Sequence, residues 1–332
     1  MLRKLFKTRE IYLFFIIVLF SAVIAFINPN FLTASNFLDL LRSTSFTGIM
    51  AIGSFIVLLS GGIDVSFSAI ASIAAYSTGK IIIMGGGNLF YAFVLVIVIG
   101  IILGAVNGFL IYYLNAPTIV ITIATMGIYY GLLLFITRGV LISLLPEYIE
   151  KFGNSYIFTF LNKNGVISGF SIFTLIWIVI LIITWLILKH TMIGRSIFAM
   201  GSNVEGAKRE GINILKLQLF IYSFMGLLAG IGGLVHTGLN QMIKPNALIG
   251  TELMVIAAVV IGGASLTGGS GTLLGTTLGV LLLAIISNGL TLAKVSSFWQ
   301  NFVIGLILLV SVSITAYQEI YVKRKHIRVK IN

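Results

Sequence analysis

Few ionisable side chains stand within the long apolar runs of this chain, and those few define the chemistry open to it. Asp64 and Glu252 each stand at the start of a run, and His236 lies near the end of another. A charge at the centre of a membrane helix costs at least ~2.5–3.5 kcal/mol, so a proton or ion relay normally shows several such residues. Both acids can be read either as carboxylates near the positive end of a helix dipole or as pathway residues. The scarcity of charges argues against ion-coupled transport.

The familiar catalytic arrangements are absent from the sequence. Gly79-Lys80 lacks the preceding glycine of a phosphate-binding loop, and Gly269-Ser270-Gly271 has no lysine, so we expect no ATP bound in P-loop fashion. No Ser/His/Asp, HExxH or paired-carboxylate pattern stands in a suitable setting. The chain has no cysteine, which excludes disulfides and cysteine-based metal sites. We expect neither catalysis nor a metal site.

Neutral polar side chains inside the apolar runs are candidates for lining a pathway through the bundle, because they offer hydrogen-bond donors and acceptors without charge. Hydrogen bonding between helices is an equal alternative for each of them. The candidates are Asn107, Thr125, Ser287 and Asn288, together with Asn246, Glu252 and Asp64 at the ends of runs.

Composition identifies the elements that must position these side chains. Hydrophobic residues make up 58% of the 332 residues and charged residues only 9%, whereas soluble chains carry roughly 25% charged residues. Because a membrane helix needs about 20 mostly apolar residues, we predict an all-α polytopic bundle of about ten spans. The predicted spans are 11–27, 46–60, 63–84, 88–114, 117–136, 170–188, 216–238, 252–267, 271–292 and 297–317.

The distribution of basic residues predicts the orientation. With the N-terminus inside, ten spans place 1–10, 189–216 and 318–332 in the cytoplasm, and these segments hold 14 of the 21 basic residues. This bias agrees with the positive-inside rule and predicts a multi-pass membrane protein with both termini cytoplasmic and lipid around it. The net charge of +12 does not predict nucleic-acid binding, since no basic domain or aromatic–basic interleaving accompanies it.

The whole chain, 1–332, is interpreted as one membrane domain with two long loops. Segment 137–169 is an extracytoplasmic loop that could contact a partner or merely link two spans. Segment 189–215 is a polar cytoplasmic loop in which residues 203–210 could form a short helix capped by Asn203. A rigid element of this kind can transmit a movement to the membrane spans.

Glycines recur at every fourth position in two spans, a spacing that lets helices approach closely in lipid. The predicted packing residues are Gly100, Gly104 and Gly108 in the fourth span and Gly271, Gly275 and Gly279 in the ninth. Asn107-Gly108 and Asn288-Gly289 stand in spans five positions apart. Halves with five spans each would have inverted topology, as in many transporters.

Four segments in order resemble the ribose-type family of ABC sugar-importer permeases. Residues 60–68, SGGIDVSFS, are similar to that family's SGGIDLS segment, and residues 252–271, ELMVIAAVVIGGASLTGGSG, to its EL-x-x-IAA-x-V-x-GG-x-SL-x-GG-x-G segment. Between them, 194–203 resembles GR-x-x-x-A-x-G-x-N. Asn288-Gly289 and then Phe298-Trp299-Gln300 follow.

The resemblance implies a permease subunit that works with a second permease chain, identical or related, a cytoplasmic ABC ATPase and an extracytoplasmic solute-binding protein. MgATP would be bound by the ATPase, and this chain would hold no cofactor. The family's motif assigns contact with the ATPase to Gly194, Arg195, Gly201, Asn203, Ala207, Gly211 and Ile212.

The expected function is inward movement of a monosaccharide, a ribose-like pentose or a hexose, by ATP-driven alternating access. An importer of the same class for autoinducer-2 or a nucleoside is the alternative. An ion-coupled sugar carrier and a non-transport membrane scaffold are disfavoured. In this interpretation Asp64 shapes a helix break on the cytoplasmic side, and Glu252 and Asn246 lie near the outer end.

Overall fold

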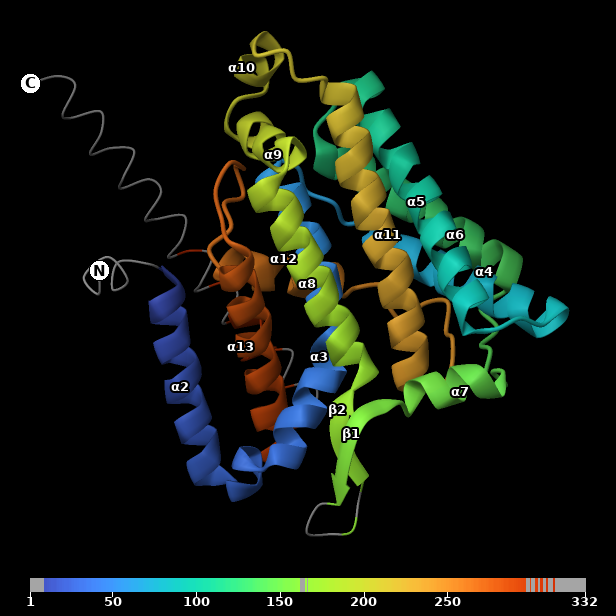
Figure 1. The fold of residues 1–332 in the computed structure, drawn as a ribbon, viewed down its shortest axis with the longest axis vertical. Helices are drawn as coiled ribbons and strands as arrows, with labels where there is room; N and C mark the ends of the chain where they lie inside the picture. The colour runs from blue at the N-terminus through green and yellow to red at the C-terminus, as the bar shows by residue number, and fades with distance from the viewer. Residues whose placement is uncertain are drawn as a thin grey trace, which may run out of the picture.

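The computed structural model describes residues 9–161, 165, 167–296 and isolated positions between 299 and 313. In this part of the chain, helices account for nearly all of the regular structure (Figure 1). The elements are α2 (Arg9–Ile27), η1 (Pro29–Leu32), α3 (Ala34–Leu59), α4 (Phe67–Gly85), α5 (Leu89–Leu114), α6 (Thr118–Thr137), α7 (Glu147–Gly153), β1 (Tyr156–Leu161), β2 (Ile167–Ser171), α8 (Ile172–His190), α9 (Met192–Ser202), α10 (Val204–Arg209), α11 (Ile214–Asn240), α12 (Glu252–Ile261) and α13 (Leu273–Leu292).

Eight of the described helices are long and apolar enough to cross a membrane, which confirms an all-α polytopic bundle: α2, α3, α4, α5, α6, α8, α11 and α13. The eighth predicted span, 252–267, contains only the ten-residue helix α12, too short to cross the ~30 Å hydrocarbon layer. The tenth, 297–317, falls almost wholly outside the described residues. Exact span number and inverted halves stay predictions.

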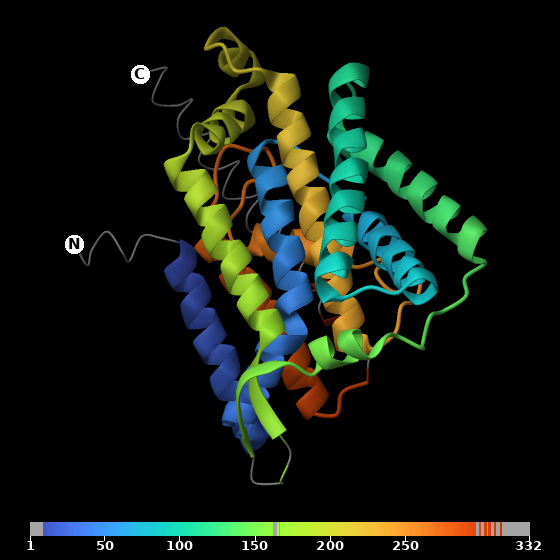
Figure 2. The ribbon, with the colours of Figure 1, turned by 45° about the vertical axis from the view of Figure 1, so that its right-hand side comes forward.

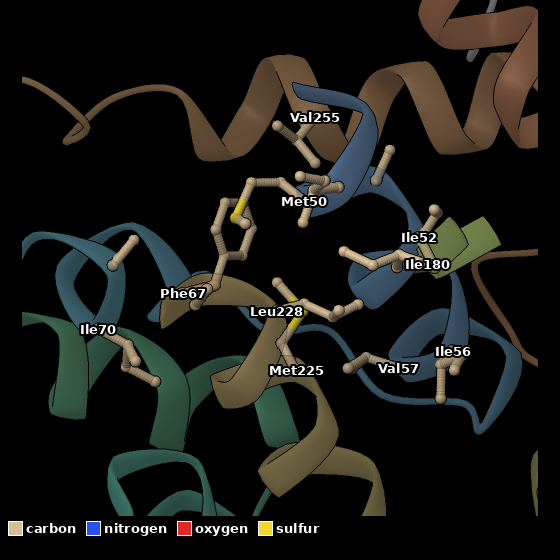
Figure 3. Close-up of a cluster of buried hydrophobic side chains, with 14 of the residues drawn as sticks. Met50, Ile52, Ile56, Val57, Phe67, Ile70, Ile180, Met225, Leu228 and Val255 are labelled. Carbon is tan, nitrogen blue, oxygen red and sulfur yellow. The ribbon is translucent and has the colours of Figure 1, made fainter. Parts of the chain in front are cut away.

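Helix α3 forms the centre of the bundle and is longer than the predicted span 46–60. From Phe46 to Leu59 nearly every side chain is buried, because α8, α11, α12 and α13 all pack against this helix. Figure 3 shows Met50 of α3 beside Phe67 of α4, and Val57 of α3 on the side of Met225 of α11. This part of α3 therefore lies inside the bundle.

Helices α5 and α11 pack backbone against backbone. A Cβ atom on Gly100 would overlap the carbonyl oxygen of Gly226, and one on Gly226 would overlap that of Gly100. Gly104 lies in the same way against the carbonyl of Tyr222, and Gly108 against Gln218. These glycines therefore permit the close helix contact that replaces hydrophobic driving force in lipid.

The glycines predicted for the ninth span divide between two structures. Gly275 and Gly279 lie in α13, where added Cβ atoms would overlap the carbonyls of Gly262 and Ala258. Gly271 is not on that helix face, because α13 begins only at Leu273. It lies in the preceding connection with φ +148° against Phe55 and Ala264, so the prediction of a third packing glycine in the helix was wrong.

The two predicted loops contain regular structure at opposite ends of the bundle (Figures 1 and 2). Segment 137–169 holds α7, β1 and the start of β2, an antiparallel pair in which Thr159 faces Gly169. Arg42 fixes α7 by donating from its guanidinium to the carbonyl oxygen of Gly153 at 2.9 Å. Segment 189–215 is mostly helical, as α9 and α10, because Thr191 and Asn203 each supply a helix cap.

We predict that Gly104→Ala destabilises the bundle, because its Cβ would overlap the α11 backbone. Overpacking costs roughly 1–3 kcal/mol, and the unfolding midpoint in detergent, followed by circular dichroism or dye fluorescence, should fall by several degrees. The matched control is Gly131→Ala on α6, where no atom lies within 4 Å of the added Cβ. Equal midpoints for the two variants would contradict close packing between α5 and α11.

Candidate functional site

A seven-residue break, 60–66, separates α3 from α4 inside the bundle. Gly61 takes φ +86°, and its amide and that of Gly62 still bond back to the last turn of α3. Beyond them the chain is extended, and α4 begins at the fully buried Phe67. The sequence prediction of a helix break next to Asp64 is therefore confirmed.

The first turns of α6 satisfy the extended backbone of this break. The amide of Ile63 donates to Thr118 Oγ1 at 2.9 Å, and the amide of Val65 donates to Thr122 Oγ1 at 3.4 Å. Thr122 Oγ1 also donates to the carbonyl oxygen of Ile63 at 3.1 Å. Non-helical backbone at membrane depth is tolerated only where protein or water pairs it, and two threonines do so here.

A buried polar network extends from the break to α5 and α6. Asp64 is 3% exposed, and its Oδ1 accepts from the Ser66 amide at 2.7 Å and the Ser66 hydroxyl at 2.6 Å. Asn107 donates to Ser66 Oγ at 2.6 Å and accepts from the Tyr129 hydroxyl at 3.3 Å. Asn107 thus joins α5 to the break, the helix-pairing role that was the alternative to lining a pathway.

Asp64 does not stand in the first turn of α4, which contains no acid; the helix starts three residues later. Its second carboxylate oxygen, Oδ2, has no hydrogen-bond partner among the described residues. Thr125 is buried, and its hydroxyl donates to the carbonyl oxygen of Thr122 in the same helix at 3.2 Å. Neither side chain lines the cavity described below.

Glu252 connects the start of the short helix α12 to the start of α4. It stands in the first turn of α12, as one interpretation predicted, and accepts hydrogen bonds from the Ser68 hydroxyl of α4 and, at 2.8 Å, from the Gly250 amide. Its 4% exposure contradicts the expectation that it faces solute or a binding protein near the outer end. Asn246 is exposed in the connection between α11 and α12.

Helices α9 and α10, with the turn that follows them, carry the residues of the 194–212 motif. Asn203 Oδ1 accepts from the Gly206 amide at 2.9 Å, which confirms the predicted cap of α10. The helix ends with Gly211 at φ +80°, and the Ile212 amide bonds back to the Ala207 carbonyl, the pattern of a Schellman motif. The motif residues Gly211 and Ile212 therefore terminate this helix.

Two further features shape α9 and α10. Gly194 permits the tight corner between α8 and α9, since a Cβ there would overlap the carbonyls of Ile187 and Leu188. Arg195 is exposed. On α10 the exposed Lys208 Nζ lies 2.9 Å from Glu205 Oε1. The hydrogen bond to this carboxylate raises the pKa of Lys208. The exposed face of α10 thus carries both signs of charge.

The end of α9 contacts the helix break directly. A Cβ on Gly201 would overlap the carbonyl oxygen of Leu59, the last residue of α3. That carbonyl accepts a hydrogen bond from the Gly269 amide at 2.9 Å, and Gly268 packs on Gly61. We call this contact of α9, the 60–62 turn and the 262–272 connection the glycine joint.

A cavity of about 310 Å³ lies between α3 and α13, in the half of the bundle that carries β1 and β2. Ser287 and Asn288, both predicted pathway residues, line it, whereas the other predicted pathway residues do not. Its lining residues are Leu40, Ser43, Thr44, Thr47, Met254, Val280, Leu283, Ala284, Ser287, Asn288 and Thr291.

Sequence reasoning missed the partners of the predicted residues. Ser66 bonds both Asp64 and Asn107, Tyr129 bonds Asn107, and Ser68 bonds Glu252. Apart from Ser66 and Asp64, which stand two residues apart, no sequence spacing links these partners. Asn36 forms a reciprocal amide pair with Asn288, with N–O distances of 3.0 and 3.1 Å. The only signal for Ser66 and Ser68 was their place within the 60–68 motif.

Comparison with known proteins gives one consistent result. Residues 36–312 match the family model described as branched-chain amino acid transport system / permease component. The chain is 31% identical to the ribose import permease protein RbsC of Haemophilus influenzae, over 90% of both chains, and 36% identical to that of Bacillus subtilis, over 87% of both. It is 32% identical to the autoinducer 2 import system permease protein LsrC of Yersinia pseudotuberculosis, over 93% of this chain and 85% of the relative. No solved structure matches the chain.

We predict that Asn107→Leu lowers the free energy of unfolding by roughly 1–3 kcal/mol, because it removes a buried hydrogen-bond partner of Ser66 and Tyr129. Tyr129→Phe should also lower it, because the change removes the hydroxyl that bonds both Asn107 and the carbonyl oxygen of Leu103. In a double-mutant cycle followed by denaturant unfolding in detergent, the two costs should not add.

The matched control is Tyr130→Phe at the next position, whose hydroxyl makes no hydrogen bond to any described residue. It should leave stability unchanged and show no coupling to Asn107. Additive costs for Asn107→Leu and Tyr129→Phe would show that the network does not act as a unit.

Proposed function

The chain belongs to the branched-chain amino acid transport system / permease component family, and from this premise we propose that it carries a monosaccharide inward as the membrane subunit of a binding-protein-dependent ABC importer. Members of this family are transport components rather than enzymes, and in bacteria they are multi-pass inner-membrane proteins. A ribose-like pentose or a hexose is the proposed solute, because the ribose import permeases match along 87–90% of this chain.

The single observation that carries the coupling mechanism is the glycine joint. Helix α10 stands outside the bundle and directly follows α9. Near the end of α9, Gly201 contacts Leu59, the last residue of α3. A partner that pushes on α9 and α10 therefore acts on the break between α3 and α4 and on the 262–272 connection together. Packed helices have few alternative arrangements, so such a push shifts whole elements rather than dissipating locally.

We propose that the partner at α9 and α10 is a cytoplasmic ABC ATPase, which binds MgATP and supplies the energy. Its contact residues are Arg195, Asn203, Ala207 and their neighbours in the motif. Both termini then lie in the cytoplasm, and α7 with the β1–β2 hairpin faces the extracytoplasmic binding protein. A second permease chain, identical or related, completes the pathway.

Autoinducer-2 is the second candidate solute. The observation in its favour is the identity of 32% to an autoinducer 2 import permease over 93% of this chain, which is as high as that to several ribose permeases. Both solutes are small, neutral and rich in oxygen, so they place the same demands on a pathway.

The test of this function is uptake into proteoliposomes that contain the permease, its cognate ATPase and its binding protein. We expect uptake of radiolabelled D-ribose that requires ATP on the side of the membrane where the ATPase is bound. Ionophores that dissipate ion gradients should not reduce this uptake. If unlabelled autoinducer-2 inhibits this uptake at a lower concentration than unlabelled ribose does, autoinducer-2 is the solute. Uptake that persists without the ATPase and follows an ion gradient would contradict an ABC mechanism.

We predict that Gly201→Val uncouples transport, because its side chain would displace the end of α3 from α9. D-Ribose uptake should fall by about tenfold or more, the effect of ~1.4 kcal/mol in a coupled equilibrium, while basal ATP hydrolysis persists. The matched control on α9 is Ser196→Ala, whose exposed hydroxyl bonds only within its own helix. Normal uptake by Gly201→Val with an unchanged unfolding midpoint would exclude the joint from coupling.

A further inference from the structure

The cavity between α3 and α13 is walled by hydroxyl groups and lacks charge. Ser43, Thr44 and Thr47 face it from α3, and Ser287 and Asn288 face it from α13. The remaining wall is apolar, with Leu40 and Leu283 among its residues. Its volume of about 310 Å³ is at the lower end of the range for small-molecule sites, ≈ 300–1,000 Å³.

Three of these hydroxyls have no hydrogen-bond partner in the described part of the chain: those of Thr44, Thr47 and Ser287. Serine and threonine within helices commonly bond back to a carbonyl of the preceding turn, and neighbours such as Ser45 and Thr277 do so. Thr44 is only 6% exposed. Thr47 and Ser287 are half-buried, so all three hydroxyls stand at the cavity wall with donors and acceptors available to water or a ligand.

Asn288, which lines the cavity, pairs with Asn36. The two amides exchange both hydrogen bonds, at 3.0 and 3.1 Å, and so connect α13 to the first turn of α3. Each neutral hydrogen bond contributes only about 0.5–1.5 kcal/mol net. A pair of this strength holds the helices together and still opens and closes without a large energy input.

From these contacts we propose that the cavity is the solute-contact site of the permease, that it takes a neutral polyhydroxylated solute, and that the Asn36–Asn288 pair is its gate on the hairpin side. This inference rests on the proposed function and specifies where the solute is held. Free hydroxyls on two helices match the donors and acceptors of a sugar, and Leu40 and Leu283 match its C–H faces. A lipid chain would leave the three hydroxyls unpaired, at a cost in free energy.

The absence of cysteine from the natural chain makes this site accessible to a direct experiment. Thr47→Cys and Ser287→Cys each introduce one thiol into the cavity, and Leu274→Cys introduces one at an exposed apolar position of α13 away from it. The assembled importer in proteoliposomes is treated with a charged methanethiosulfonate or with an apolar maleimide. Modification rates and D-ribose uptake are measured, with and without D-ribose and binding protein.

If the cavity holds solute, both cavity thiols react with the charged reagent at least about tenfold faster than Leu274→Cys, since only thiols in water ionise readily. D-Ribose slows that reaction, and modification abolishes uptake. Reaction with the apolar reagent alone would show that lipid fills the cavity, and no reaction with either would show close packing. Either result, or undiminished uptake after modification, overturns the proposal.

The gate is tested separately with Asn36→Cys/Asn288→Cys. Oxidation should join α3 to α13 and stop uptake, and reduction should restore it, whereas either single variant should be insensitive to oxidation. A disulfide that forms without any loss of uptake would exclude the gate. Uptake by the unsubstituted importer separates these results from a failure of the proposed function. If the proposed function is wrong, that importer takes up no D-ribose, even when the cavity thiols react with the charged reagent.

Discussion

Backbone hydrogen bonding in a membrane is the constraint on which the rest of this structure depends. Seven residues between α3 and α4 leave the helical conformation inside the bundle, where lipid offers no donors or acceptors. Thr118 and Thr122 of α6 satisfy the exposed backbone of Ile63 and Val65. Without α6 in contact, these backbone groups would need other partners, because each one left unsatisfied in lipid costs several kcal/mol.

The break allows polar chemistry to concentrate in one place. Asp64, Ser66, Asn107 and Tyr129 form a connected series of hydrogen bonds from the break to α5 and α6. On the other side, Ser68 and Glu252 join the starts of α4 and α12. Helices α4 and α12 thus meet at their first turns, and a shift of either helix changes the surroundings of the other.

Glycine supplies the second requirement, which is close approach without interlocking side chains. The α5–α11 seam is rigid because backbone meets backbone over several turns. The glycine joint brings α9 to the same end of α3 where the break begins, and the cavity lies further along α3. Helix α3 therefore connects the proposed site of ATPase contact with the proposed site of solute contact (Figure 1).

The sequence by itself determined the class of the protein: a helical membrane bundle, its main spans, the helix break, the capped α10 and the family. These features are local, since apolar length, a cap and a motif are each contained in a continuous stretch of chain. Only the tertiary structure decided which polar residues meet. Asn36 and Asn288 are 252 positions apart, and Ser68 and Glu252 are 184 apart. No period or spacing encodes such pairs, because they arise from the way helices distant in sequence pack around α3. The same reason explains why Glu252 is buried and Gly271 precedes its helix.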